Sequence, residues 1–158
     1  MKPILTSELK RFNYLTSEID AAYHEAALMF HLSDSAMMVL YCLYSNDGCC
    51  MLSDICLMSG VSKQTINSAL RKLEEEQILY LQATDGKKKM VHLTEKGLQL
   101  ASQTVACIIE IENNIFNSWT PAETRQYLEL TQRYLTTFRE KVQEFERERI
   151  EPNEDSII

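Results

Sequence analysis

Apolar residues along most of this chain recur at steps of three and four, the spacing that places them on one face of an α-helix. The first such stretch predicts a helix from about Thr6 to Phe30, and the last predicts a helix that begins at Thr120. The sequence Thr120-Pro121-Ala122-Glu123 forms a capping box with proline at the first helical position, which marks that start. The apolar positions are Leu5, Leu9, Phe12, Ile19, Tyr23, Ala26 and Phe30 in the first stretch and Leu128, Leu135, Phe138, Val142 and Phe145 in the last.

Shorter helices are predicted between these two. Ser33 is a suitable N-cap for a second helix, which the turn sequence Asn46-Asp47-Gly48 ends. A short third helix covers residues 52–59 and is closed by Gly60, because glycine readily takes the positive φ of a tight turn. Ser62 then caps a fourth helix, from about Lys63 to Gln77.

The fourth helix is predicted to have two different faces, since successive residues step by about 100° around the axis. Ile66, Ala69, Leu70 and Leu73 gather on an apolar back. The opposite front, within about 60° of Gln64, is polar and able to form hydrogen bonds. It carries Gln64, Asn67, Ser68 and Arg71.

A β-hairpin follows, because residues 78–83 and 90–93 read as two short aliphatic strands around an Asp85-Gly86 turn. Its tip carries Lys87, Lys88 and Lys89. Thr94 is then expected to cap a fifth helix, whose apolar positions keep helical spacing as far as Trp119. The acidic tail after Ile150 is expected to be disordered.

The distribution of charge distinguishes one segment from the rest of the chain. The 158 residues carry a net charge of −7, which argues against a general nucleic-acid coat protein. The stretch from Val61 to Leu93, however, contains six basic and four acidic residues, so its net charge is +2 and that of the remainder is −9. An acidic body with one locally basic segment indicates binding confined to one face.

Other chemistry is sparse. No two of the five cysteines form a C-x-x-C pair; they are Cys42, Cys49, Cys50, Cys56 and Cys107. We expect them to be buried and to pack as small hydrophobic residues, and not to serve as metal ligands or redox groups. The three histidines show no metal-binding spacing, so no metal or cofactor is expected. No nucleophile elbow or phosphate loop occurs, and the protein is therefore expected not to be an enzyme. The absence of a secretory leader and of a long apolar run predicts a cytoplasmic protein with no membrane span.

The order of these elements predicts a mainly α protein with a small β-hairpin wing, a winged helix-turn-helix flanked by long helices. Gln and Asn match the edge of adenine and Arg that of guanine, so Gln64, Asn67 and Arg71 are candidates for base contacts. The remaining candidate DNA-binding residues are Ser62, Lys63, Thr65 and Ser68 near the start of the helix and Lys87, Lys88 and Lys89 in the wing. The competing interpretation is that the polar face and the lysine turn are ordinary solvated surface.

The chain resembles the MarR family, the multiple antibiotic resistance regulators, at Leu52-Ser53-Asp54-Ile55, at residues 61–67, at Leu73-Glu74, at Asp85-Gly86-Lys87 and at residues 92–97. The resemblance covers about 33–97 by motif and the outer helices by pattern only. It implies a homodimer that binds palindromic double-stranded DNA and often responds to a small-molecule effector.

Two positions depart from the family pattern. Lys87 stands where the family usually has a wing arginine, and a bidentate contact is thereby lost. Gln77 stands where the family usually has glycine. No cysteine precedes Cys42, so the oxidant sensing of one family branch is not implied.

The resulting hypothesis is a ligand-responsive transcription regulator, with residues 33–97 binding DNA, residues 4–32 and 98–149 forming the dimer, and residues 150–158 a disordered tail. The alternative is a winged-helix protein-interaction module that does not bind DNA. The effector site stays unknown. Tyr14, Tyr23, Phe30, Met37 and Met38 are candidates for a cleft, but such a stripe is more typical of a core.

Overall fold

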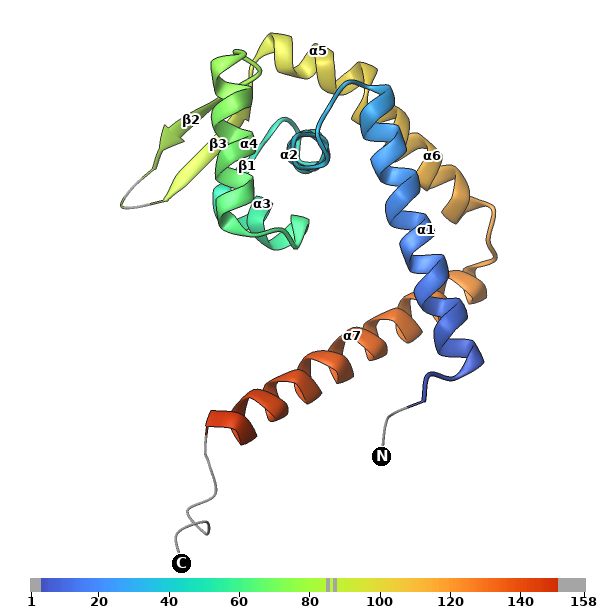
Figure 1. Cartoon of the computed structure of the whole chain (residues 1–158). Coiled ribbons are helices and arrows are strands. Elements are labelled where there is room, and N and C mark those ends of the chain that lie inside the picture. Colours follow the sequence, from blue (N-terminus) through green and yellow to red (C-terminus); the bar gives the residue numbers. More distant parts are fainter. Residues whose placement is uncertain (1–3, 85, 87, 151–158) are drawn as a thin grey trace, which may run out of the picture. The chain divides into compact units, whose positions relative to one another are not determined.

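A computed structural model describes residues 4–84, 86 and 88–150. The chain divides into two compact units, Met1–Glu110 and Ile111–Ile158, and each is described by itself (Figure 1). The helices are α1 (Ser7–Met29), α2 (Asp34–Tyr44), α3 (Leu52–Ser59), α4 (Lys63–Glu75), α5 (Glu95–Gln103), α6 (Val105–Asn117) and α7 (Pro121–Ile150). The strands are β1 (Cys49–Met51), β2 (Leu79–Ala83) and β3 (Lys89–Leu93). The expected acidic tail, residues 151–158, lies outside the described residues.

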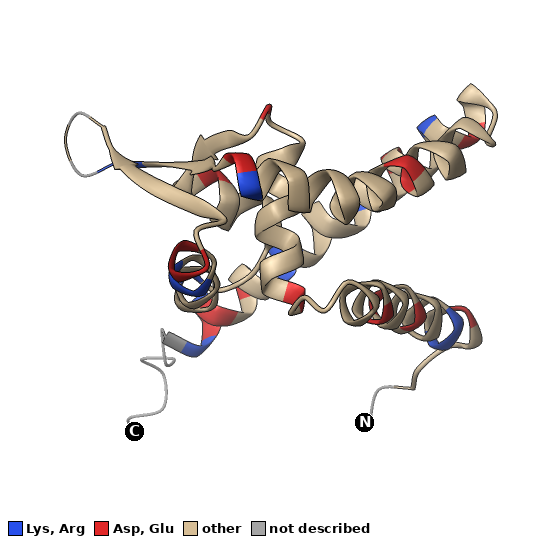
Figure 2. Cartoon of the chain, turned by 90° about the horizontal axis from the view of Figure 1, so that it is seen from above, with Lys and Arg blue, Asp and Glu red and all other residues tan. Residues whose placement is uncertain are grey.

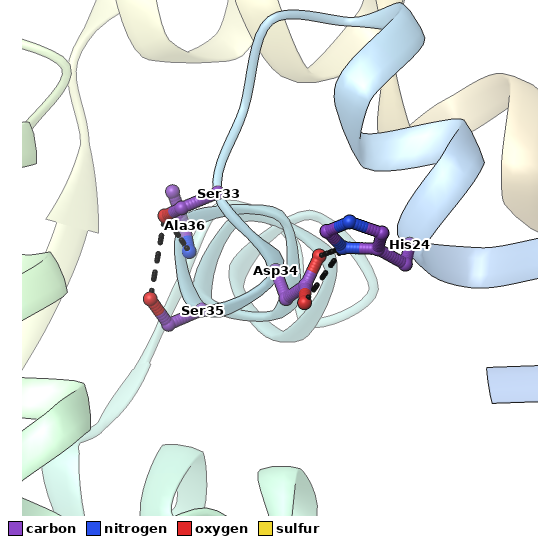
Figure 3. A network of polar contacts seen from close by, with 5 residues as sticks. All are labelled: His24, Ser33, Asp34, Ser35 and Ala36. Atoms are coloured by element: carbon purple, nitrogen blue, oxygen red, sulfur yellow. Dashed lines mark hydrogen bonds and ion pairs between the residues drawn. The ribbon is translucent and has the colours of Figure 1, made fainter. Parts of the chain in front are cut away.

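Side-chain caps start the helices where the sequence predicts them. Thr6 accepts a hydrogen bond from the Leu9 amide and starts α1, and Ser33 accepts one from the Ala36 amide and starts α2. Figure 3 shows the start of α2, where the Asp34 carboxylate lies 2.8 Å from Nδ1 of His24 on α1. This contact joins the first helix to the second.

The hydrophobic core of the first unit comes mainly from α2, α4 and the sheet. Val39, Leu40 and Leu43 of α2 are fully buried, and so is Ile66 of α4. Met37 is 7% exposed and belongs to this core, whereas Tyr14 of α1 is 61% exposed. The candidate aromatic and methionine stripe therefore divides between core and surface.

The sheet has three strands in the order β1-β3-β2, all antiparallel. The sequence predicted only the β2–β3 hairpin. The strand β1 was missed because three residues, Cys49 to Met51, are too few to show a period of two. In the structure β1 pairs with β3 through Cys50 opposite Val91.

The predicted continuous helix from Thr94 to Trp119 is wrong, because it breaks at Thr104. This residue has φ −126° and ψ −84° and is only 5% exposed. Its hydroxyl donates to the Leu100 carbonyl at 2.7 Å, and its amide donates to the Ala101 carbonyl, three residues back and not four as in an α-helix. A threonine that bonds back to the preceding turn bends a helix, and α5 and α6 therefore form separately.

The fourth helix also ends earlier than predicted. The helix α4 stops at Glu75 and Gln77 takes φ +60°, in the left-handed region. Glycine reaches this region without strain, but glutamine does not. Glutamine at position 77 therefore keeps the backbone turn but lowers the free energy of unfolding relative to glycine.

The second unit contains the long helix α7, which starts with the predicted capping box. The Thr120 amide donates to Oε2 of Glu123 at 2.8 Å, and the Glu123 amide donates to Oγ1 of Thr120 at 3.3 Å. The bond from the Thr120 amide, followed by a bond from the Thr120 hydroxyl to Oε2 at 2.7 Å, lowers the pKa of the Glu123 carboxyl. The start predicted at Pro121 is thereby confirmed.

Both long helices leave many large apolar side chains in contact with solvent. On α1 they include Leu9, Phe12 and Ile19, and on α7 Leu128, Leu135 and Phe138, each between 37% and 59% exposed. Within the described residues no single helix has the length and apolar composition of a membrane span. The helices α1 and α2 meet those criteria only jointly, across an 88° bend.

Candidate nucleic-acid interface

The helix α4 has the two faces that the sequence predicts. Its back is buried, with Ile66, Ala69, Leu70 and Leu73 at most 7% exposed. Its front contains the exposed residues Lys63, Gln64, Thr65, Ser68 and Arg71 and the half-buried Asn67. The apolar back attaches the helix to its own unit, so the polar front remains available to a partner.

Ser62 and Thr65 have a structural task at the start of α4. The Ser62 hydroxyl accepts a hydrogen bond from the Thr65 amide at 3.2 Å and lies 2.9 Å from the Thr65 hydroxyl. Ser62 is therefore first of all the N-cap of the helix. Both residues stay exposed where the positive end of the helix dipole favours an anion.

A groove of about 520 Å³ separates α4 from the wing, the β2–β3 hairpin. The structure brings four candidates together here, Lys63 and Asn67 of α4 with Lys88 and Lys89 of the wing. The other lining residues are Met51, Leu52, Ser53 and Cys56, from β1 and α3. Gln64, Thr65, Ser68 and Arg71 lie on α4 but do not line the groove, and Lys87 lies outside the described residues.

The wing lysines are held by a short turn. The amide and the hydroxyl of Thr84 both donate to the Lys88 carbonyl at 3.1 Å, and Ala83 is paired with Lys89 across the ladder. Gly86 takes φ +87°, which allows the chain to reverse. Lys88 and Lys89 are exposed, and among the described residues neither these lysines nor Lys63 forms an ion pair.

Hydrogen bonds between the two ends of the hairpin fix the wing relative to α4. Thr94 donates through its hydroxyl to the Gln77 carbonyl at 2.7 Å and through its amide to the Ile78 carbonyl at 3.0 Å. The Lys96 ammonium donates to the Glu76 carbonyl at 2.7 Å, which satisfies a carbonyl at the end of α4. Sequence reasoning missed this role of Lys96, because the contact joins residues twenty positions apart.

Sequence reasoning also missed Ser53, the second residue of α3. Its hydroxyl donates to the Asp54 carboxylate at 3.2 Å and it lines the groove beside the lysines. The only available signal was its position near the start of a short helix before the Gly60 turn, which does not specify a groove. Charge is mixed over the rest of the chain (Figure 2), and three lysines that form no ion pair with another described residue line the groove.

The cysteines follow the buried pattern only in part. Cys42 and Cys50 are buried as predicted, Cys49 and Cys56 are half-buried, and Cys107 is exposed, so the prediction is wrong for Cys107. Burial raises the pKa of the Cys42 thiol, and burial followed by the neighbouring Cys42 raises that of Cys50 to about 11. These two thiols therefore stay protonated at neutral pH. Among the described side chains, no three His, Cys, Asp or Glu residues are placed to hold a metal ion.

Solved structures of MarR family regulators match this chain over most of its length. A regulator from Neisseria meningitidis has a TM-score of 0.77 at 17% identity, over 88% of this chain and 99% of that one. MepR from S. aureus has a TM-score of 0.70 at 19% identity, over 84% and 99% of the two chains. AbsC from Streptomyces coelicolor has a TM-score of 0.68 at 14% identity, over 87% and 99%. The sequence matches no family model and no curated protein. With its helical content and three-stranded sheet, the chain has the winged-helix fold of the MarR family regulators.

Proposed function

We infer that this protein is a transcription regulator of the MarR type that binds a palindromic operator as a homodimer and is not an enzyme. The observation that carries the proposal is the groove in which Lys63 and Asn67 of α4 meet Lys88 and Lys89 of the wing. A helix with a polar front fits the major groove of DNA, and a cationic hairpin beside it fits the adjoining phosphates or minor groove.

A structure similar to this chain supports the proposal. MepR from S. aureus, at 20% identity and a TM-score of 0.64, has been solved as a DNA complex. A second MepR structure is described as the DNA-binding conformation. The rival function, a winged-helix module that binds only protein, draws its support from the net charge of −7 and the missing wing arginine.

The proposed contacts divide between base edges and backbone. Gln64, Asn67 and Arg71 read bases, because their side chains match adenine and guanine edges in the major groove. The hydroxyls of Ser62, Thr65 and Ser68 and the ammonium of Lys63 bind phosphates near the start of α4. Lys87, Lys88 and Lys89 supply positive charge to the flanking backbone.

A homodimer is part of the proposal because each long helix exposes an apolar stripe. Residues 4–32 and 98–149 would form the dimer and residues 33–97 would bind DNA. Dimers of this kind bury on the order of 2,000 Å² or more. A small-molecule effector that changes DNA affinity, a repressor role and a cytoplasmic location complete the proposal.

The test is a titration of the purified protein with duplex DNA at several salt concentrations. The duplex is an operator selected from random sequence by the protein itself. Asn67→Ala is expected to cost about 1 to 3 kcal/mol on the selected operator and much less on unrelated duplex. Lys89→Ala is expected to weaken binding to both duplexes and to reduce the salt slope by roughly one unit per lost phosphate contact.

Lys10→Ala serves as the control, because it removes an exposed lysine of α1 outside the groove. It should leave affinity and salt slope unchanged. If wild-type protein selects no sequence and shows no salt-dependent affinity for duplex DNA, the protein-interaction module is the correct function.

A further inference from the structure

The three-stranded sheet, here called the wing sheet, turns one face toward the core. Its opposite, outer face brings together four side chains of types that can bind a metal ion. The register pairs Cys49 with His92 and Met51 with Met90. Because residues two apart on a strand share a face, these four side chains form a two-by-two array across β1 and β3. The residues between them, Cys50 and Val91, are buried on the opposite face.

The dimensions of the array suit a single ion. Side chains directly opposite on antiparallel strands have Cβ atoms about 4.5 to 5.5 Å apart, within reach of one cation. All four residues are half-buried, so the array is partly shielded yet open on one side. Met51 also lines the groove beside α4 and thus lies at the border of the array.

The histidine provides a second, independent observation. Nε2 of His92 is buried, and within the described part of the chain no protein group bonds to it. A buried polar atom without a partner calls for a water or an ion. The ring of His92 stacks on Tyr80, with centroids 5.0 Å apart and planes at 11°. Because a nitrogen lone pair lies in the ring plane, this stacking holds the imidazole without covering the lone pair.

We propose that Cys49, His92, Met90 and Met51 form a binding site for a soft monovalent cation, Cu(I), on the outer face of the wing sheet. Thiolate and thioether sulfur select Cu(I), and imidazole also binds copper. Structural zinc takes four ligands from cysteine, histidine and carboxylate, and the array offers only two of these. Binding replaces the proton of the Cys49 thiol with the metal and releases that proton.

The test uses the full-length protein alone, without DNA, so its outcome does not depend on the proposed function. Reduced protein is titrated anaerobically with Cu(I) in competition with bicinchoninate, a coloured Cu(I) chelator. We expect one Cu(I) per chain, and Zn(II) should bind at least about a hundredfold more weakly. X-ray absorption of the bound copper should show a mixed shell of sulfur and nitrogen.

Variants locate the site. Cys49→Ser and His92→Ala should each weaken Cu(I) binding at least about tenfold. This lower limit is the loss seen when a residue that only hydrogen-bonds to a metal ligand is removed, and a ligand itself should matter more. Met90→Leu should also weaken it while the protein keeps its fold, because leucine and methionine have similar volumes. Cys107→Ser, at an exposed cysteine of α6, is the matched control and should bind Cu(I) as the wild type does.

Wild-type affinity in both Cys49→Ser and Met90→Leu would overturn the proposal. A loss of binding in Cys107→Ser, or a bound copper with a shell of sulfur alone, would overturn it as well. Circular dichroism of each variant shows that a lost affinity does not come from unfolding.

Discussion

Gly97 of α5 lies so close to the start of β2 that alanine should not fit. A Cβ atom at this position would lie 1.9 Å from the Ile78 carbonyl oxygen, whereas real Cβ contacts are essentially never under 3.0 Å. The carbonyl must therefore move by at least 1.1 Å, the difference between the two distances. Ile78 is 3% exposed and cannot turn toward solvent.

The cost follows from the bonds that this carbonyl accepts. The Thr94 amide donates to it at 3.0 Å, and the Thr94 hydroxyl, which shares its one proton with the closer Gln77 carbonyl, lies 3.1 Å away. Leaving this buried carbonyl without its partners costs about 2 kcal/mol, and forcing extra volume into packed structure adds about 1 to 3 kcal/mol. Replacing a helical glycine by alanine returns about 1 kcal/mol. Gly97→Ala should therefore lower the free energy of unfolding by about 2 to 4 kcal/mol.

Urea unfolding followed by circular dichroism measures this loss, at one protein concentration because a dimer's stability depends on it. Gly60→Ala is the matched control, since its Cβ meets nothing within 4 Å and only its φ of +63° is unfavourable. The control should cost about 1 to 2 kcal/mol. If Gly97→Ala were no more destabilising than Gly60→Ala, close packing of α5 on β2 would not be the reason for glycine at position 97.

Three further predictions concern the backbone, pH and assembly. Gln77→Gly should raise the free energy of unfolding by about 1 kcal/mol in the same urea assay, because φ is +60°, and Gln77→Ala should bring no such gain. The folded protein holds the Cys50 proton up to a pKa of about 11, against 9.0 for the ordinary thiol. The contribution of this thiol to the free energy of unfolding is therefore fully present below pH 9 and is lost between pH 9 and 11, so the wild type should lose up to about 2 kcal/mol more than Cys50→Ala over this range; equal slopes would refute this. Removal of residues 120–158 should leave a monomer in sedimentation velocity, and a persisting dimer would exclude α7 as a dimer element.

Local chemistry made the helix starts predictable. Ser33, Ser62, Thr94 and Thr120 were identified from short polar signals, and each accepts the expected bond from an amide three residues later. A cap needs only its own helix, so the sequence within four residues is sufficient. The amphipathic character of α4 was predictable for a similar reason.

Features that leave the spacing of apolar residues unchanged, or that need contacts between distant segments, were not predictable. The break at Thr104 leaves the spacing of apolar residues unchanged, because it comes from a hydroxyl that bonds back to Leu100. The strand β1 exists only through its pairing with β3. The sequence predicted Asn67 on a helix and Lys89 in the wing, but it did not predict that folding brings both to one groove with Ser53.

Under the proposed function, an acidic chain and a groove that binds DNA are compatible, because the relevant electrostatics are local. At physiological salt, charges more than about 8 Å apart in solvent are largely screened from each other. The described residues that line the groove include three lysines and no acidic residue, although Asp54 accepts a hydrogen bond from the lining residue Ser53. A phosphate in the groove would therefore interact mainly with Lys63, Lys88 and Lys89, with Asp54 opposing them, and much less with acidic residues beyond the screening distance. The acidic remainder still opposes nonspecific attachment, which depends on the number of phosphates neutralised. Under the proposed function, this opposition leaves a larger share of the binding free energy to the base-reading face of α4, and discrimination between operator and other DNA increases.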